Sequence, residues 1–393
     1  MLDSLYIAWK YIKFNKVKSA TLVGCITLLV FLPLSLELLL DESEQQLMSR
    51  AVTTPLVVGA KGSALDLMMN SLYFGDEVPE LITMEASHHV ADTDLAYSIP
   101  LYIRFKARGF PIVGTTLDYF DFRGLKIASG ESLAMLGECV IGTSVAERLG
   151  LKPGDSLVSS PENLFDLAGV YPLKMKVSGV LEKSHTSDDL GIFVDLKTAW
   201  IIQGLMHGHQ DVTKTSDQTV ILEKTEGNVT ANAKLFQYTE INEENMDSFH
   251  FHGDNSKYPI TAVIAVPDDA KSGTILRGRY LSGETAYQIV QPKDVIDGLL
   301  QNIFRIKNVL DAVIVVVGFA TVLAIVLVFA LSLRLRQREI QTIFKLGCRR
   351  ATIARLLGAE IFIVGAASIF VCGALVFMVN VFANDLVRGV FIR

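Results

Sequence analysis

The sequence contains little cysteine: four residues in 393, at Cys25, Cys139, Cys348 and Cys372. Two of them lie in long apolar runs and Cys348 lies in a basic segment, so only Cys139 falls in the large polar part of the chain. One cysteine cannot form an internal disulfide, which excludes a disulfide framework there. That part must therefore be stabilised by its hydrophobic core, and it is long enough for one or two packed subdomains.

An excess of positive charge is also missing, because 36 Lys and Arg face 42 Asp and Glu, for a formal net charge of −6. Bulk charge therefore does not favour a nucleic-acid partner. No run fits the phosphate-binding pattern G-x-x-x-x-G-K-[ST], and GAKGSALD, which begins at Gly59, lacks its spacing. Any ATPase activity is expected in a separate chain, with ATP and Mg²⁺ bound there.

No arrangement of nucleophile and base stands out either. Ser184, His185 and Asp188 are close in sequence. Catalytic triads are assembled in space, however, and such local runs are usually accidental. We therefore predict that the chain is not an enzyme and has no catalytic residue.

Long hydrophobic runs are what the chain has instead. Half of its residues are hydrophobic, and the mean hydropathy is +0.37. Residues 20–40, 309–333 and 356–382 are each long enough to cross a bilayer as a helix. Residues 1–19 combine apolar positions at helical spacing with four lysines, which predicts an amphipathic helix at the cytoplasmic membrane surface. A plain positive flank is the alternative; a signal peptide is rejected because no cleavage site follows so long a run.

The segment 334–355 is strongly basic, with seven Arg and Lys residues and one acid, Glu339. Short basic loops between membrane spans stay on the cytoplasmic side. This places the N-terminus inside, and it places residues 41–305 and the tail 383–393 outside. Cytoplasmic retention accounts for the basic residues, but it does not account for the apolar residues Ile340, Ile343, Phe344 and Leu346 in so short a loop.

Residues 41–305 show short runs rich in Val and Ile, bounded by turn residues. Helical spacing at 36–48 and 295–310 predicts stalks that lead into the first and second spans. The chain is therefore predicted to consist of α-helical membrane spans and a large extracytoplasmic α+β domain, which the helical stalks join to the spans. The predicted strands are 54–59, 101–105, 110–114, 174–181, 192–195, 219–223 and 260–266, and the predicted helices are 63–69, 144–149, 197–203, 230–237 and 270–280.

Two H-x-H pairs, His207 with His209 and His250 with His252, form a candidate metal site. Positions i and i+2 of a strand share a face, and imidazole suits zinc or copper. The alternative is that polar loops collect histidine and that the two pairs lie apart.

Three stretches resemble the MacB-like periplasmic core domain in the expected order: PIVGTTLDYFDFRGLKIASGE (111–131), ECVIGTSVAERLGLKPGDSL (138–157) and KVSGVLEKSHTSDDLGIFVDLKTAW (176–200). The basic loop is similar to the family's coupling segment over 338–350. The chain thus resembles an ABC transporter permease of the FtsX/MacB type, also called the mechanotransmission class.

This resemblance implies a plasma-membrane permease that works as a homodimer or heterodimer with a separate cytoplasmic ATPase. Export or extraction of a lipophilic, peptide or lipoprotein substrate is expected, with a periplasmic adaptor or substrate protein as a further partner beside membrane lipids. Such permeases usually have four spans, whereas no fourth apolar run follows Phe382. The residues implied to couple to the ATPase are Arg338, Glu339, Ile340, Ile343, Phe344, Lys345, Gly347, Arg349 and Arg350.

The alternative function is that of a non-transporting envelope protein that carries an external signal inward or activates a hydrolase. Two spans flanking an external domain suffice for that role. The third span and the absence of any encoded signalling domain argue against it. Copurification with an ATPase discriminates between the two.

Overall fold

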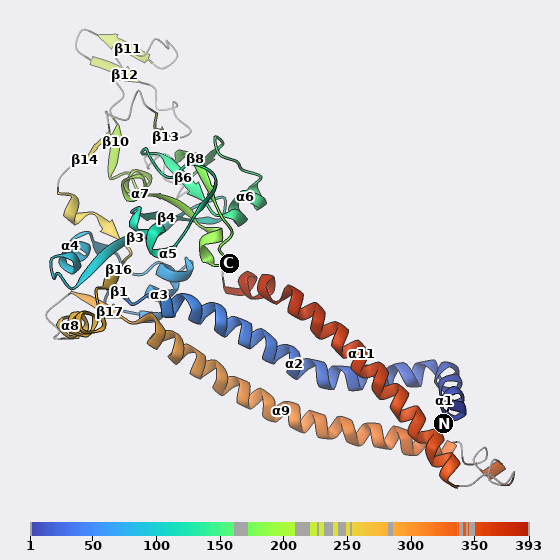
Figure 1. The fold of residues 1–393 in the computed structure, drawn as a ribbon. Helices are drawn as coiled ribbons and strands as arrows, with labels where there is room; N and C mark the ends of the chain where they lie inside the picture. Colours follow the sequence, from blue (N-terminus) through green and yellow to red (C-terminus); the bar gives the residue numbers. More distant parts are fainter. Residues whose placement is uncertain are drawn as a thin grey trace. The chain divides into compact units, whose positions relative to one another are not determined.

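The computed structural model describes residues 2–160, 172–208, 221–225, 228–231, 239–242, 249–251, 254–281, 286–335, 337, 341–342, 345 and 350–391. The chain divides into a helical unit, residues 1–45 and 298–390, and a sheet unit, residues 46–297. Figure 1 shows the helices and strands of both units.

Within the described part of the chain, three helices are long and apolar enough to cross a membrane. They are α2 (Lys16–Thr53), α9 (Pro292–Leu335) and α11 (Arg350–Phe391), and they include the three predicted spans. The amphipathic helix predicted over residues 1–19 is shorter in the structure. Helix α1 (Leu2–Phe14) ends before Asn15, and residues 16–19 already belong to α2. The predicted tail continues α11 as helix through Phe391.

Polar contacts join α2 to both other long helices within the helical unit. Lys307 Nζ on α9 lies 3.4 Å from Glu37 Oε1 on α2. Lys18 Nζ lies 3.3 Å from Glu360 Oε1 on α11, and Thr27 Oγ1 donates to the Ser368 carbonyl at 3.4 Å. The Glu37–Lys307 pair joins the predicted stalk that follows the first span to the predicted stalk that leads into the second.

The sheet unit is built on one mixed, 11-stranded sheet, which confirms the α+β class. Its order is β13-β8-β6-β9-β4-β3-β16-β1-β17, with β5 and β7 also paired to β8. The strands of this sheet are β1 (Leu56–Ala60), β3 (Ala96–Ala107), β4 (Phe110–Thr115), β5 (Ile127–Gly130), β6 (Glu138–Ile141), β7 (Ser156–Val158), β8 (Leu173–Leu181), β9 (Ile192–Asp195), β13 (Thr239–Glu240), β16 (Ala262–Pro267) and β17 (Tyr287–Val290).

Three two-stranded ribbons and several short helices complete the described part of this unit. The ribbons pair β2 (Ile82–Thr83) with β15 (Pro259–Ile260), β10 (Met206–Gly208) with β14 (Phe249–Phe251), and β11 (Ile221–Thr225) with β12 (Asn228–Ala231). The helices are α3 (Ala64–Tyr73), α4 (Glu85–Ala91), α5 (Asp118–Arg123), α6 (Thr143–Leu149), α7 (Leu196–Ile202), α8 (Ala270–Leu281) and the 3-10 turns η1 (Ser187–Leu190) and η3 (Asn255–Lys257).

Each strand predicted from sequence overlaps a strand of the structure, whereas the helix predicted at 230–237 is wrong at its start. Residues 228–231 form β12 instead, and residues 232–238 lie outside the described part. A two-residue turn joins β3 to β4, because Arg108 and Gly109 both adopt positive φ, at 48° and 86°. This turn makes the predicted strands at 101–105 and 110–114 a continuous hairpin.

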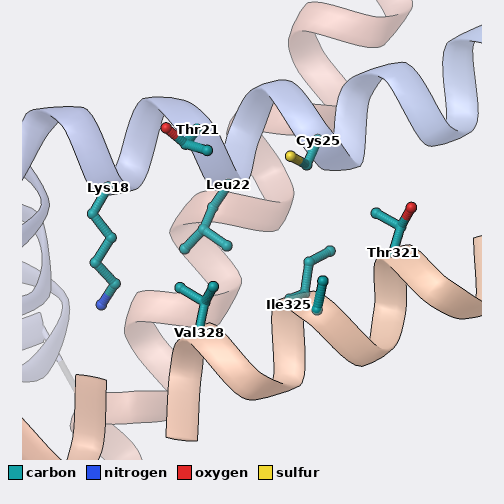
Figure 2. Close-up of a pocket in the computed structure, with 8 residues that line it drawn as sticks. Lys18, Thr21, Leu22, Cys25, Thr321, Ile325 and Val328 are labelled. Carbon is teal, nitrogen blue, oxygen red and sulfur yellow. The ribbon is translucent and has the colours of Figure 1, made fainter. Parts of the chain in front are cut away.

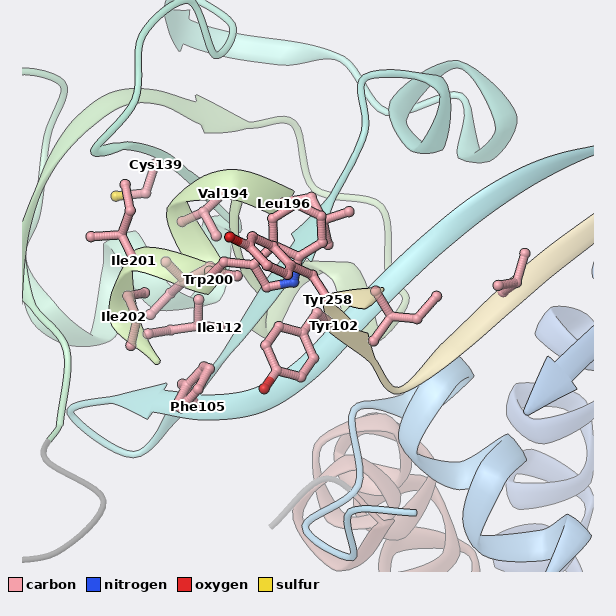
Figure 3. Close-up of a cluster of buried hydrophobic side chains, with 14 of the residues drawn as sticks. Tyr102, Phe105, Ile112, Cys139, Val194, Leu196, Trp200, Ile201, Ile202 and Tyr258 are labelled. Atoms are coloured by element: carbon pink, nitrogen blue, oxygen red, sulfur yellow. The ribbon is translucent and has the colours of Figure 1, made fainter. Parts of the chain in front are cut away.

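Aromatic residues form the centre of the core between α7 and the sheet (Figure 3). The rings of Trp200 and Tyr258 meet edge to face, with centroids 5.0 Å apart. Trp200 Nε1 donates to the Pro259 carbonyl at 2.8 Å, so the indole is buried without losing its hydrogen bond. This contact ties the end of α7 to the start of β15.

The long helices α2 and α9 attach to neighbouring strands of the sheet. Helix α2 ends at Thr53, and β1 begins three residues later; α9 begins two residues after β17 ends. Strands β1 and β17 pair antiparallel, with Val57 opposite Val290. The end of one long helix and the start of the other are therefore joined to the same end of one strand pair.

Candidate functional site: the buried end of helix α2

Arg50 lies in the last turn of α2, and its side chain is buried. Arginine is almost never fully buried unless it is paired. Here Nη1 lies 2.5 Å from Asp188 Oδ2, and Nη2 donates to Asp188 Oδ1 at 2.8 Å. Nη2 also donates to the Tyr119 hydroxyl at 2.6 Å. The guanidinium thus forms a two-pronged ion pair, the geometry that makes arginine–carboxylate contacts strong and directional.

The partners of Arg50 come from two other parts of the sheet unit. Asp188 lies in η1, whose N-cap Thr186 accepts from the Asp188 backbone N–H and donates to its carboxylate at 3.0 Å. Tyr119 lies in α5, directly after β4, and its hydroxyl donates to Asp188 Oδ1 at 2.8 Å. Its ring packs on Phe193 of β9, with centroids 5.7 Å apart. Arg50, Tyr119 and Asp188 are called the α2 joint below.

A second set of contacts surrounds the joint. Arg123 donates to Thr54 Oγ1 at 2.9 Å, the Tyr73 hydroxyl donates to the Leu47 carbonyl, and the Arg50 guanidinium lies 5.3 Å from the centroid of the Phe74 ring. Two turns of α2 are therefore bonded to α3 and α5 as well as to η1.

Charge is held inside the joint at neutral pH. Burial by itself raises the pKa of Asp188, but the charge and hydrogen bonds of Arg50, with Arg123 and the Tyr119 hydroxyl, lower that pKa below its ordinary value. Burial raises the pKa of Tyr119 to about 12, against the opposing effect of Arg50. Asp188 is therefore ionised and Tyr119 protonated near pH 7, which is the state that the hydrogen bonds require.

The Ser184–His185 run beside the joint is held by Asp189. Asp189 Oδ1 accepts from the backbone N–H and hydroxyl of Ser184, and Oδ2 accepts from the backbone N–H of His185. The carboxylate closes a turn and does not orient an imidazole ring. The arrangement around η1 therefore fastens backbone segments together.

A groove of about 210 Å³ opens between α2 and α9 in the helical unit (Figure 2). Lys18, Thr21, Leu22 and Cys25 line it from α2, and Thr321, Ala324, Ile325 and Val328 line it from α9. Lys18 is paired with Glu360, as described above. The lining is mostly apolar and offers no acid–base pair for chemistry.

The predicted coupling residues lie almost entirely outside the described part of the chain. Lys345 is helical and exposed, and Arg350 begins α11. Arg338, Glu339, Ile340, Ile343, Phe344, Gly347 and Arg349 lie outside the described residues. Their role stays a prediction.

The predicted metal ligands are partly described. His207 lies in β10 and His250 in β14, and the two are paired positions of the antiparallel ribbon. His209 and His252 lie outside the described residues. Among side chains that the structure does describe, no group of three or more His, Cys, Asp or Glu is placed to hold a metal ion.

Sequence reasoning missed the α2 joint. One signal was present: Leu47, Arg50, Ala51 and Thr54 follow the spacing i, i+3, i+4, i+7, and all four are buried. A basic residue on the apolar face of a helix requires a buried acid. The sequence did not show which of the many carboxylates fills that place.

Comparison with known proteins identifies the domain. The family model of the MacB-like periplasmic core domain matches residues 41–235. The chain matches no protein of curated function. Among solved structures, it is similar to the periplasmic region of MacB from Actinobacillus actinomycetemcomitans, at 13% identity and a TM-score of 0.35, over 66% of this chain and 99% of that one. It is also similar to the extracellular domain of the noncanonic ABC-type transporter YknZ from Gram-positive bacteria, at 12% identity and a TM-score of 0.33. That match covers 60% of this chain and 98% of the other.

The sequence identities and TM-scores to these solved structures are too low to support an assignment. The assignment therefore rests on the family model and on the helices that flank the matched residues. The matched residues begin within α2 and take in the joint, and α2, α9 and α11 are long and apolar enough to cross a membrane. Residues 41–235 are therefore part of a MacB-like periplasmic core domain, and with the helices that flank them the chain is similar to the MacB/FtsX-like ABC transporter permeases.

Proposed function

We propose that this chain is the permease subunit of an ABC transporter whose ATPase is a separate cytoplasmic chain. The observation that carries the proposal is the MacB-like periplasmic core domain placed between helices long and apolar enough to cross a membrane. The chain is a multi-pass protein of the plasma membrane, with its large domain in the periplasm. It works as a dimer, and it exports or extracts a lipophilic, peptide or lipoprotein substrate.

Helix α2 carries the movement from the membrane to the domain. It is one uninterrupted helix of 38 residues, which at 1.5 Å per residue is about 57 Å long. Its last two turns are bonded to α3, α5 and η1 through the α2 joint and its surroundings. The end of the helix therefore cannot turn or slide without moving those elements.

Helix α9 supplies the second connection. It starts directly after β17, the neighbour of β1. A relative shift between α2 and α9 then acts on one strand pair and changes the shape of the periplasmic domain. This follows the general rule that packed elements have discrete arrangements and pass small shifts on as larger ones.

The movement enters through the basic segment 334–355. Glu339, Ile340, Ile343 and Phe344 contact a groove on the ATPase, while the arginines and lysines hold the segment on the cytoplasmic side. ATP-driven closure of the ATPase pair displaces this segment and, through it, α9 and α11.

The test is copurification from native membranes. The full chain, carrying an affinity tag, is extracted in detergent, and its partners are identified by mass spectrometry. An ABC ATPase is expected with the wild type, and its yield is expected to fall at least tenfold with Phe344→Asp or Glu339→Lys. Lys271→Glu, at an exposed position of α8, is the matched control and is expected to retain the partner.

An absent ATPase, or loop variants that retain it fully, contradicts the proposal. The first outcome favours the envelope-signalling alternative. The second leaves an ABC complex that is joined through other residues.

A further inference from the structure

Glu360 is a buried acid in a helix that is long and apolar enough to cross a membrane. It lies on α11, and its side chain is 6% exposed. The Lys18 ammonium of α2 lies 3.3 Å from Glu360 Oε1. Ionisable side chains are rare within membrane spans, and where one occurs a partner and a function are the first expectation. Anchoring in the bilayer does not require this pair, because the apolar runs of both helices supply it.

The ion pair is one end of a polar seam between α2 and α11. Thr27 Oγ1 donates to the Ser368 carbonyl at 3.4 Å, and Ser368 Oγ donates to the Val23 carbonyl at 3.5 Å. Lys18 and Thr27 are nine positions apart in sequence, and Glu360 and Ser368 are eight positions apart. The two helices therefore run parallel and stay in step over more than two turns.

A buried stripe on α11 carries both of these contacts. Its members follow one another at a spacing of four residues, and all of them are buried: Glu360, Val364, Ser368 and Cys372. Residues at this spacing lie on one side of a helix. A turn of α11 about its axis would move the Glu360 carboxylate away from Lys18, so the seam fixes the rotation of α11 against α2.

Lys18 also contacts helix α1. Its ammonium lies 5.5 Å from the centroid of the Tyr11 ring, and the neighbouring Ser19 hydroxyl donates to the Ile12 carbonyl at 3.5 Å. On the side of α9, Lys18 lines the mostly apolar groove between α2 and α9 (Figure 2). Around Lys18, α2 is therefore held to α1 and α11 by direct contacts, whereas it meets α9 across a groove.

We propose that Glu360 and Lys18 are positioning residues, which transmit a displacement of α11 to α2. This inference rests on the proposed function, in which the ATPase displaces segment 334–355 and α2 carries the movement to the periplasmic domain. Helix α11 begins at Arg350, within that segment, whereas α2 lies far from the segment in sequence. A charge-assisted hydrogen bond is directional and about twice as strong as a neutral one, so the pair gives α2 a firm connection to the displaced helix.

The experiment uses the full chain with its copurified ATPase, reconstituted in vesicles of phosphatidylethanolamine and phosphatidylglycerol. Hydrogen exchange of backbone amides in 118–123 and 187–190, the segments that hold Tyr119 and Asp188 of the α2 joint, is measured by mass spectrometry with and without ATP. The wild type is expected to show an ATP-dependent change in exchange. Glu360→Gln and Lys18→Gln are each expected to reduce that change by about fivefold or more, the lower end of typical coupling between sites. The ATPase yield is expected to stay at the wild-type value.

Lys16→Gln is the matched control, because Lys16 is an exposed lysine of α2 two positions before Lys18. It removes the same charge and is expected to respond to ATP as the wild type does. The charge-exchanged variant Lys18→Glu/Glu360→Lys forms the pair again with its charges reversed. It is expected to restore the response, which a role in packing alone does not predict.

Three results overturn the inference, and they are distinguishable. If the ATPase is retained and both single variants respond to ATP as the wild type does, the pair transmits nothing and the proposed function stands. If the single variants lose the response and the charge-exchanged variant does not regain it, the residues act through packing and not through their charges. If no ATPase copurifies with the wild type, the proposed function fails and this inference fails with it. Where Glu360→Gln does not accumulate in the membrane, Lys18→Gln decides the same question, because the Lys18 side chain is 23% exposed.

Discussion

Arg50 and Asp188, 138 positions apart in sequence, meet in a two-pronged ion pair inside the periplasmic domain. Their side chains are 4% and 2% exposed. A pair this deeply buried is costly to form and costly to break. It stands in the last turn of α2, one of the helices that are long and apolar enough to cross a membrane.

Removing either partner of the ion pair should destabilise the domain strongly. Arg50→Met or Asp188→Leu leaves an unpaired buried charge, and the free energy of unfolding is expected to fall by about 3–5 kcal/mol. The measurement is denaturant unfolding of the full chain in detergent, followed by tryptophan fluorescence. The double variant Arg50→Met/Asp188→Leu removes both charges and should recover most of the loss. Equal losses in the double and single variants would show that the charges are not paired.

Acid should weaken the joint. The pKa of Asp188 is lowered in the folded state, so its contribution to stability is fully present above the unfolded pKa, about 3.9, and is lost as pH falls through the folded pKa. We expect the unfolding free energy of the wild type to fall more steeply below about pH 4 than that of the Arg50→Met/Asp188→Leu variant. Parallel pH profiles of the two proteins would contradict this.

The Tyr119 hydroxyl should contribute measurably, because it accepts from Arg50 and donates to Asp188. Tyr119→Phe is expected to cost about 1–3 kcal/mol, the range for leaving buried polar partners unsatisfied. Thermal unfolding of the full chain measures this. Tyr97→Phe is the control, since that ring is 48% exposed, and its melting temperature should stay at the wild-type value. A Tyr119→Phe protein as stable as the control would show that the hydroxyl is dispensable.

Gly142 should not tolerate a methyl group. A Cβ there would lie 2.3 Å from the Asp189 carbonyl oxygen and 2.4 Å from that of Asp188. Both atoms are backbone of η1, so Gly142→Ala must displace the turn that presents Asp188 to Arg50. We expect a loss of about 1–3 kcal/mol, typical of overpacking, measured by denaturant unfolding. Gly278→Ala in α8 meets nothing within 4 Å and should be neutral or stabilising; if both variants behave alike, the steric argument fails.

Much of the fold was predictable from local pattern. Membrane-length helices follow from long, largely apolar runs such as residues 309–333, and strands such as β8 and β9 follow from Val and Ile bounded by turn residues. These features depend only on neighbours in sequence. The short strands β6 and β17 were missed because four residues carry too little periodicity, and the start of the helix predicted at 230–237 was wrong because β12 gains its hydrogen bonds from β11.

By itself, the sequence predicted three apolar runs of membrane length, a single cysteine in its large polar part and no match to the pattern G-x-x-x-x-G-K-[ST], and composition and spacing carry those properties. The MacB-like type of the domain came from the resemblance of three stretches to that family. Only the tertiary structure decided that Arg50 is paired with Asp188 and not with another of the 42 acids, and that His207 lies opposite His250. The physical reason is that ion pairs and strand registers join residues more than forty positions apart, and chain topology, not local pattern, selects which of many chemically equivalent partners meet.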